Sequence, residues 1–221
     1  FTPFELDITA LARPGPGNVI AISALNESVA DRLASGSKYA CHPLGGIPRT
    51  ILLMALPEAN LSSVCTTTTF DAGFRDATLK VDVEAANDGA AEVAGLQAVL
   101  ELADPAGQPV VLAPDRLDLG SLQAGAKAAK SIAIPVTAPR KWDSEHPNLY
   151  TLTVRLEAQG QPVETLRQKI GFRQVEVRGN ELFVNGVPVK LRGSNHHEVY
   201  PTTGRSVPAG IHRRDVELFR E

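Results

Sequence analysis

Apolar and polar residues alternate with a period of two through the middle of the chain. Within residues 78–84, Leu79, Val81 and Val83 alternate with polar side chains, and the pattern returns over residues 96–102. Such alternation is typical of a strand with one buried face. Similar apolar stretches, separated by turn signals, are Val110–Leu112, Leu117–Leu119, Ile132–Val136, Leu152–Leu156 and Leu166–Ile170.

About seven short strands in roughly 100 residues are the pattern of an immunoglobulin-like antiparallel β-sandwich. No helix of normal length fits this stretch. We therefore predict a sandwich over about 65–172, with alternate side chains facing its core, namely Leu79, Val81, Val83, Leu152 and Val154.

The N-terminal region has a different pattern. Asn18–Leu25 and Thr50–Leu56 are apolar enough to predict strands, and the Pro- and Gly-rich run Arg13–Gly17 predicts a turn. Between the two predicted strands, residues 27–42 show no sustained periodicity and predict a loop.

The C-terminal region predicts a strand, a loop and a helix. Asn185-Gly186 between apolar-alternating runs is the strongest short signal for a tight hairpin. A strand over Val189–Arg192 is expected to follow, then a polar loop, then a helix with Ile211, Leu218 and Phe219 on one face. Polar groups at the end of a strand are how a parallel α/β barrel presents its active site. The region therefore predicts one β/α unit of a barrel.

Composition narrows the possible partners. The net charge of the 221 residues is −3 and no basic block occurs, so nucleic-acid binding has no electrostatic support. No apolar stretch approaches the ~18 residues that span a bilayer, so we expect no membrane partner. The compartment is left open between the cytoplasm and the periplasm or exterior.

The histidines, the cysteines and the single tryptophan do not predict a metal site or a sugar-stacking platform. Cys41 and Cys65 lack a second pair of zinc ligands, and both free thiols and a disulfide stay open. Adjacent histidines cannot easily share one ion, which disfavours a metal site of His196, His197 and His212. Trp142 is expected to pack rather than stack on a sugar. No metal site and no cofactor is therefore evident.

With these residues in view, the chain resembles glycoside hydrolase family 2, the family of β-galactosidases and β-glucuronidases. The resemblance runs nearly end to end, and motifs in the same order make it specific. The segments that carry it are Phe4–Thr9 with Gly17–Ala21, Gly45–Arg49 (GGIPR), Trp142–Tyr150 (WDSEHPNLY), Gly171–Arg173 with Glu176-Val177, and Arg192–Glu198 (RGSNHHE).

The resemblance implies three parts. These are the C-terminal part of a sugar-binding jelly roll (residues 1–62), an immunoglobulin-like β-sandwich (63–172) and the start of a catalytic TIM barrel (173–221). The expected fold is thus mainly β. Pro201, Gly204, Arg205 and Val207 look more like β-galactosidases, whereas Tyr39–Pro43 lacks a tryptophan common in the family.

The family's active-site histidine matches His197, which the resemblance makes a sugar-binding residue. Glu198 is expected to touch the substrate or to brace the loop, and Arg192 and Asn195 to orient His197. His196 falls at a variable position of the motif. Retaining glycosidases need two carboxyl groups about 5–5.5 Å apart, which Glu198 alone does not supply. Asp215, Glu217 and Glu221 lie on the predicted outer helix.

The nucleophile and the acid/base are accordingly expected beyond residue 221, together with any divalent metal of the barrel. The 221 residues by themselves are expected to be inactive, with a C-terminal segment that is mobile, displaced or buried in a homo-oligomer. The intact protein is expected to act on terminal β-D-galactosides. Alternatives are a β-glucuronidase or β-mannosidase, or a stand-alone carbohydrate-binding or adhesion sandwich.

Overall fold

The computed structural model describes residues 4–24, 47, 50–193, 195–204 and 207–219. Two compact units make up the chain, Met54–Ser194 and Phe1–Leu53 with Asn195–Glu221, and each is considered by itself. The loop predicted over 27–42 and the GGIPR motif, apart from Ile47, lie outside the described residues.

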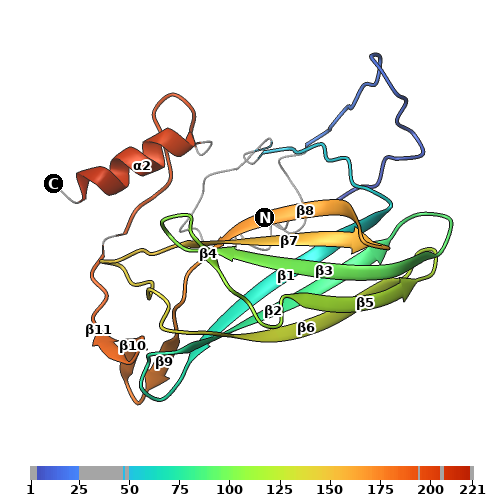
Figure 1. Ribbon diagram of the computed structural model, residues 1–221. Helices are drawn as coiled ribbons and strands as arrows, with labels where there is room; N and C mark the ends of the chain where they lie inside the picture. Colours follow the sequence, from blue (N-terminus) through green and yellow to red (C-terminus); the bar gives the residue numbers. More distant parts are fainter. Residues whose placement is uncertain (1–3, 25–46, 48–49, 194, 205–206, 220–221) are drawn as a thin grey trace. The chain divides into compact units, whose positions relative to one another are not determined.

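The first of these units is built on two antiparallel sheets (Figure 1). One sheet has the order β1-β2-β6, with bounds Ala59–Phe70, Ala77–Asn87 and Lys127–Val136. The other has the order β4-β3-β7-β8, with β5 also paired to β3; the bounds are Pro109–Val110, Val93–Ala103, Tyr150–Ala158, Gln161–Ile170 and, for β5, Arg116–Leu122. The predicted antiparallel sandwich is confirmed.

The period-two pattern produces the core between the sheets. Leu79, Val81 and Val83 of β2 are at most 1% exposed, and Leu152 and Val154 of β7 are fully buried. Their polar neighbours point to solvent because successive side chains of a strand face opposite ways. All five predicted core residues are therefore confirmed.

Strand β1 begins before the expected domain boundary. It starts at Ala59, so a boundary at residue 63 falls inside the strand. A bulge between Leu61 and Ser63 interrupts the pairing with β2. There the Leu61 N–H donates to the Glu164 carboxylate of β8 at 2.6 Å, which joins the edges of the two sheets.

Two strands predicted near the N-terminus are not formed. The described parts, 18–24 and 50–56, have no strand pairing, and Val19 and Leu53 are 89% and 75% exposed. A strand-like sequence becomes a strand only where a neighbour accepts its ladder hydrogen bonds. The predicted turn is confirmed, because the Asn18 side chain bonds the backbone of Arg13 and Gly15.

A small sheet of order β11-β10-β9 follows the sandwich. Its strands are β9 (Val175–Arg178), β10 (Glu181–Val184) and β11 (Val187–Val189), and the predicted Asn185-Gly186 hairpin joins the last two. The strand expected over Val189–Arg192 is wrong, since β11 ends at Val189 and residues 190–193 are unpaired.

The predicted C-terminal helix is confirmed as α2 (Ala209–Leu218). Ile211 is half-buried, whereas Leu218 and Phe219 are 52% and 68% exposed. Its apolar face is therefore largely open to solvent within the described residues.

Candidate functional site

The residues expected to bind sugar lie between β11 and α2. Arg192 belongs to the sandwich unit, whereas Asn195, His197 and Glu198 belong to the other unit. All four are exposed, in backbone without strand or helix. Their proposed roles as sugar ligands and orienting groups stay predictions.

The loop that carries His197 closes on itself. The His197 carbonyl accepts a hydrogen bond from the Val199 N–H at 2.8 Å. Tyr200 and Gly204 exchange two backbone hydrogen bonds, each of 2.8 Å, and Gly204 has a φ of 60°. Glycine adopts this left-handed conformation at no steric cost, which lets the chain turn back tightly.

One contact in this loop had no signal in the sequence. The His196 Nε2 atom lies 3.5 Å from the Asp215 Oδ2 atom on α2. Both side chains are partly exposed, so this pair contributes at most about 1 kcal/mol. The variable residue of the motif thus contacts the helix.

The described residues hold no group of three or more histidine, cysteine, aspartate or glutamate side chains that could bind a metal ion. Cys65 is a free, exposed thiol, and Cys41 lies outside the described residues. None of the helices in the described ranges is long and apolar enough to cross a membrane.

Trp142 lies at the junction between the sandwich and the small sheet. The Arg173 guanidinium covers its ring at 4.7 Å from the centroid, and a Cβ added to Gly171 would meet it at 2.9 Å. The Trp142 N–H also donates to the Phe172 carbonyl at 2.9 Å. These contacts confirm Trp142 as a packing residue.

Phe172, Tyr150 and Arg140 extend this junction into the core. The fully buried Phe172 ring meets the Tyr150 ring edge-on at 4.8 Å. The Tyr150 hydroxyl accepts a hydrogen bond from the Arg140 N–H at 2.8 Å, so the polar end of the ring is satisfied. The two motifs that carry these rings, WDSEHPNLY and GFR, therefore meet in space.

Polar side chains complete the junction along the edge of β1. The Gln174 Oε1 atom accepts from the Phe70 N–H at 2.7 Å. The Thr68 hydroxyl donates to the Arg173 carbonyl at 2.7 Å and accepts from the Arg173 N–H at 3.1 Å. The end of an otherwise open strand edge is covered in this way.

Two carboxylates near the junction are held ionised. Backbone hydrogen bonds from His146 and then Glu145 lower the pKa of Asp143. The Gln174 side-chain hydrogen bond, followed by that of Arg178, lowers the pKa of Glu176. A general acid needs a raised pKa, so neither carboxyl suits that role.

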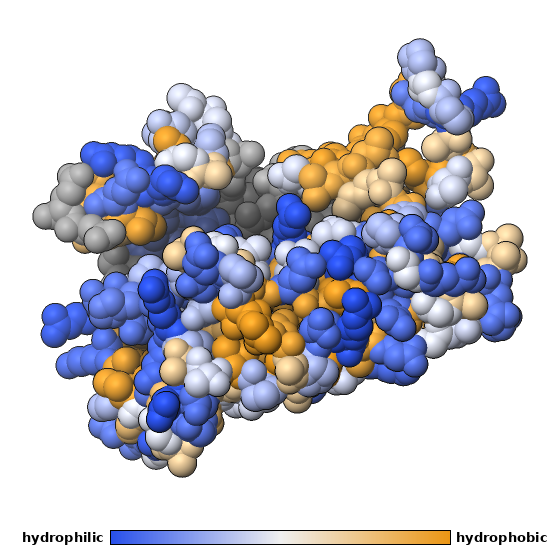
Figure 2. All heavy atoms as spheres, in the orientation of Figure 1, coloured by the Kyte–Doolittle hydropathy of each residue, from blue (hydrophilic) through white to orange (hydrophobic). Residues whose placement is uncertain are grey.

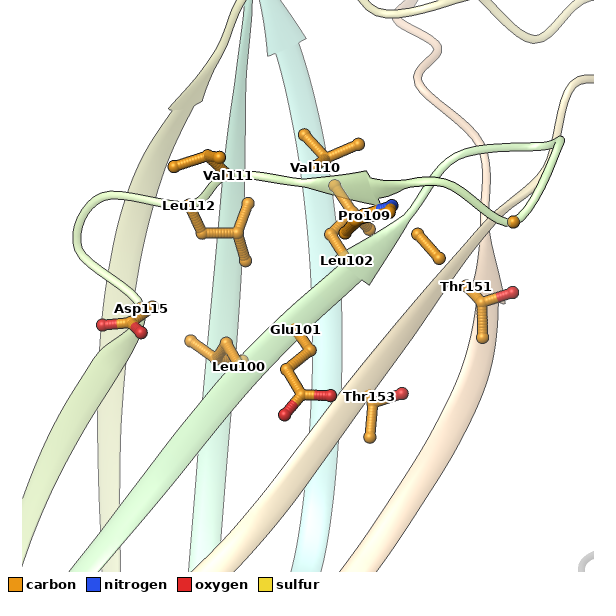
Figure 3. Close-up of a pocket in the computed structure, with 12 residues that line it drawn as sticks. Leu100, Glu101, Leu102, Pro109, Val110, Val111, Leu112, Asp115, Thr151 and Thr153 are labelled. Carbon is orange, nitrogen blue, oxygen red and sulfur yellow. The ribbon is translucent and has the colours of Figure 1, made fainter.

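A groove of about 400 Å³ lies beside β4 on the sandwich (Figure 3). Figure 2 shows apolar side chains gathered over β4 and the segment after it, where Val111 is 90% exposed. The lining has no aromatic side chain to stack on a sugar ring, and its Glu101 is paired with Arg155 at 2.9 Å. This groove is therefore not a candidate glycosidase site.

The two antiparallel sheets and the two motifs that meet at their end define a β-sandwich module. Residues 59–173 match the model of glycosyl hydrolases family 2. The chain belongs to this family.

Its relatives are much longer proteins. A β-galactosidase of Aeromonas hydrophila is 33% identical over 99% of this chain and 21% of its own length. A β-galactosidase of Priestia megaterium is 31% identical over 98% of this chain and 20% of its own length. The chain thus spans about a fifth of these relatives.

A solved structure shares the fold. A β-glucuronidase of Bacteroides uniformis superposes with a TM-score of 0.64 at 26% identity, over 75% of this chain and 20% of that one. The family expected from the sequence motifs is therefore confirmed.

Proposed function

We propose that this chain is part of a retaining glycoside hydrolase that acts on terminal β-D-galactosides. The observation that carries the proposal is the similarity to β-galactosidases, which extends over 98–99% of the chain and so includes Arg192–Glu198. A stand-alone binding module has no need for this segment, which in the family opens the catalytic barrel.

His197 is proposed to hold the sugar. A histidine ring nitrogen can donate a hydrogen bond to a sugar hydroxyl. Such bonds strengthen as positive charge develops at the anomeric carbon in the oxocarbenium-like transition state. Glu198 is proposed to contact the sugar beside it, and Arg192 and Asn195 to orient the imidazole.

The two carboxyl groups of the reaction are proposed to come from outside these residues. One would attack the anomeric carbon, while the other protonates the leaving oxygen and later activates water. In this proposal the sandwich is a spacer between the sugar-binding and catalytic parts. No step is assigned to a metal ion.

The test is a substrate comparison with the protein expressed from the complete reading frame that contains this sequence. Nitrophenyl β-D-galactoside should give the highest kcat/KM among the β-galactoside, β-glucuronide and β-mannoside. The first-formed sugar, followed by NMR, should keep the β configuration. The 221-residue chain alone should give no turnover above a purified inactive control.

β-Glucuronidase activity is the second candidate, favoured by the fold shared with the Bacteroides uniformis enzyme. Preference for the β-glucuronide would replace the first proposal with this one. Sugar binding without turnover of any glycoside would instead make the protein a binding module.

A further inference from the structure

Asn185 occupies the first central position of the β10–β11 hairpin and is followed by Gly186. Its φ is 51° and that of Gly186 is 77°, the left-handed pair that a type I′ turn requires. Asparagine tolerates this conformation better than most residues, so the backbone alone explains an asparagine here. Such turns are usually exposed, however, and Asn185 is only 8% exposed.

An asparagine followed by glycine can react with its own backbone. The glycine nitrogen forms a bond to the asparagine Cγ atom and loses its proton, while the bond from Cγ to Nδ2 breaks and ammonia leaves. Water then adds to either carbonyl of the resulting five-membered imide and opens it to aspartate or isoaspartate. Glycine favours the attack because no Cβ obstructs its nitrogen. The Asn-Gly pair occurs once in the sequence, at Asn185.

The fold engages both polar atoms of the Asn185 amide. Its Oδ1 atom accepts from the Gln174 N–H at 3.0 Å, and its Nδ2 atom donates to the Trp142 carbonyl at 3.0 Å. The Asn185 N–H also donates to the Gln174 carbonyl at 2.8 Å. Because Nδ2 is the nitrogen that leaves as ammonia, the reaction has to break the hydrogen bond to Trp142.

Gly186 is held by packing on the other side of the turn. A Cβ added there would lie 2.5 Å from the Phe74 ring, so the hairpin backbone rests directly on the β1–β2 connection. Phe74 in turn lies 6.1 Å from Phe70, ring centre to ring centre. Imide formation draws the Asn185 Cγ atom onto the Gly186 nitrogen, so the peptide that rests on Phe74 has to move. Close packing of this kind opposes such a movement.

We propose that Asn185 is a latent deamidation site that reacts only when the hairpin separates from Trp142 and Gln174. The rate in the folded protein is then set by the small fraction of molecules in which this contact is open. The product cannot close again in the same way. A carboxylate oxygen would face the Trp142 carbonyl where Nδ2 now donates, and a buried charge without a partner is unfavourable. Deamidation thus makes a transient opening permanent.

The first test compares the folded 221-residue chain with the same chain unfolded in guanidinium chloride, at one mildly alkaline pH. Trypsin releases residues 179–190 as one peptide, in which mass spectrometry follows Asn180 and Asn185 separately. Asn185 should convert at least about 10-fold more slowly in the folded chain. Asn180 is exposed and precedes Glu181, so its slow conversion should be similar in both states. Equal rates at Asn185, or no conversion in the unfolded chain, overturn the proposal.

The second test opens the junction without unfolding the chain. Gly171→Ala places a Cβ 2.9 Å from two Trp142 atoms and should raise the Asn185 rate at least about 3-fold, whereas Gly73→Ala meets only Asp71 and should not. Circular dichroism checks that both variants stay folded. If Gly171→Ala unfolds, guanidinium chloride below the unfolding transition of the wild type replaces it. A rate that rises only with global unfolding contradicts a local opening.

The third test concerns the product. Trp142 is the single tryptophan of the 221-residue chain, so its fluorescence reports the junction directly. Asn185→Asp matches one of the two products, and Asn180→Asp adds the same charge in the exposed turn between β9 and β10. Asn185→Asp should shift the emission to longer wavelength and increase quenching by acrylamide, and Asn180→Asp should not. A wild-type spectrum for Asn185→Asp and for the deamidated chain would refute the permanent opening.

Discussion

The Arg173 guanidinium carbon lies 4.7 Å from the centre of the Trp142 ring. The pair joins the end of β8 to the long β6–β7 connection, at the point where the chain leaves the sandwich. A cation over an aromatic face contributes about 0.5–2 kcal/mol, depending on desolvation. The junction is thus a packed interface rather than a loose linker.

Gly171 should tolerate no side chain. A Cβ there would lie 2.9 Å from two Trp142 atoms, so Gly171→Ala must displace the indole. We expect a loss of about 1–3 kcal/mol in the free energy of unfolding, as for other overpacked sites. Urea unfolding of the 221-residue chain measures it.

Gly73→Ala is the matched control. Its added Cβ would meet only Asp71 Oδ1, at an ordinary contact distance of 3.7 Å. An effect of Gly171→Ala no larger than that of Gly73→Ala would show that the indole moves freely.

Leu79→Ala should strongly destabilise the sandwich. Leu79 is fully buried on β2, and such truncations cost about 2–5 kcal/mol because a cavity remains. Val111, which is 90% exposed beside β4, provides the comparison, and Val111→Ala should change stability by less than about 0.5 kcal/mol. Similar urea midpoints for the two variants would contradict the assigned core.

Ionisation of Asp143 should make the free energy of unfolding depend on pH in the acid range. Its carboxylate accepts from the His146 and Glu145 N–H groups at 2.6 and 2.9 Å, which lowers its pKa in the folded protein. Because Asp143 is more acidic in the folded protein than in the unfolded chain, its ionised carboxylate stabilises the fold at pH values above the unfolded pKa of about 4. This stabilisation is lost as the pH falls through the pKa of the folded state.

Asp143→Asn removes this titration. The difference in melting temperature between wild type and variant should be largest above roughly pH 5 and should shrink as pH falls toward about pH 2. A difference that stays constant across this range would mean that the charge of Asp143 contributes nothing.

Local pattern was enough to predict the sandwich. Leu79, Val81 and Val83 alternate with polar residues, and each strand finds its partner within the same unit. Asn18–Leu25 and Thr50–Leu56 have comparable composition, but the described residues supply them with no partner strand. Strand propensity alone could not distinguish the two cases.

Less of the candidate site could be predicted from the sequence. The Asn-Gly pair predicted the hairpin, yet its burial depends on Trp142 and Gln174, which lie elsewhere in the chain. His196 falls at a variable position of the motif, yet it contacts Asp215. Contacts of this kind arise from tertiary packing, for which a single sequence carries no periodic signal.

The final prediction separates the two adjacent histidines. In the protein from the complete reading frame, His197→Ala should lower kcat/KM for a β-galactoside by about 10²-fold, since the lost hydrogen bond matters most in the transition state. His196→Ala removes only a partly exposed contact with Asp215 and should cost less than about 5-fold. Circular dichroism of both variants controls for folding. Equal and small kinetic effects would remove His197 from the site, whereas a larger loss at His196 would make the contact with α2 the more important one.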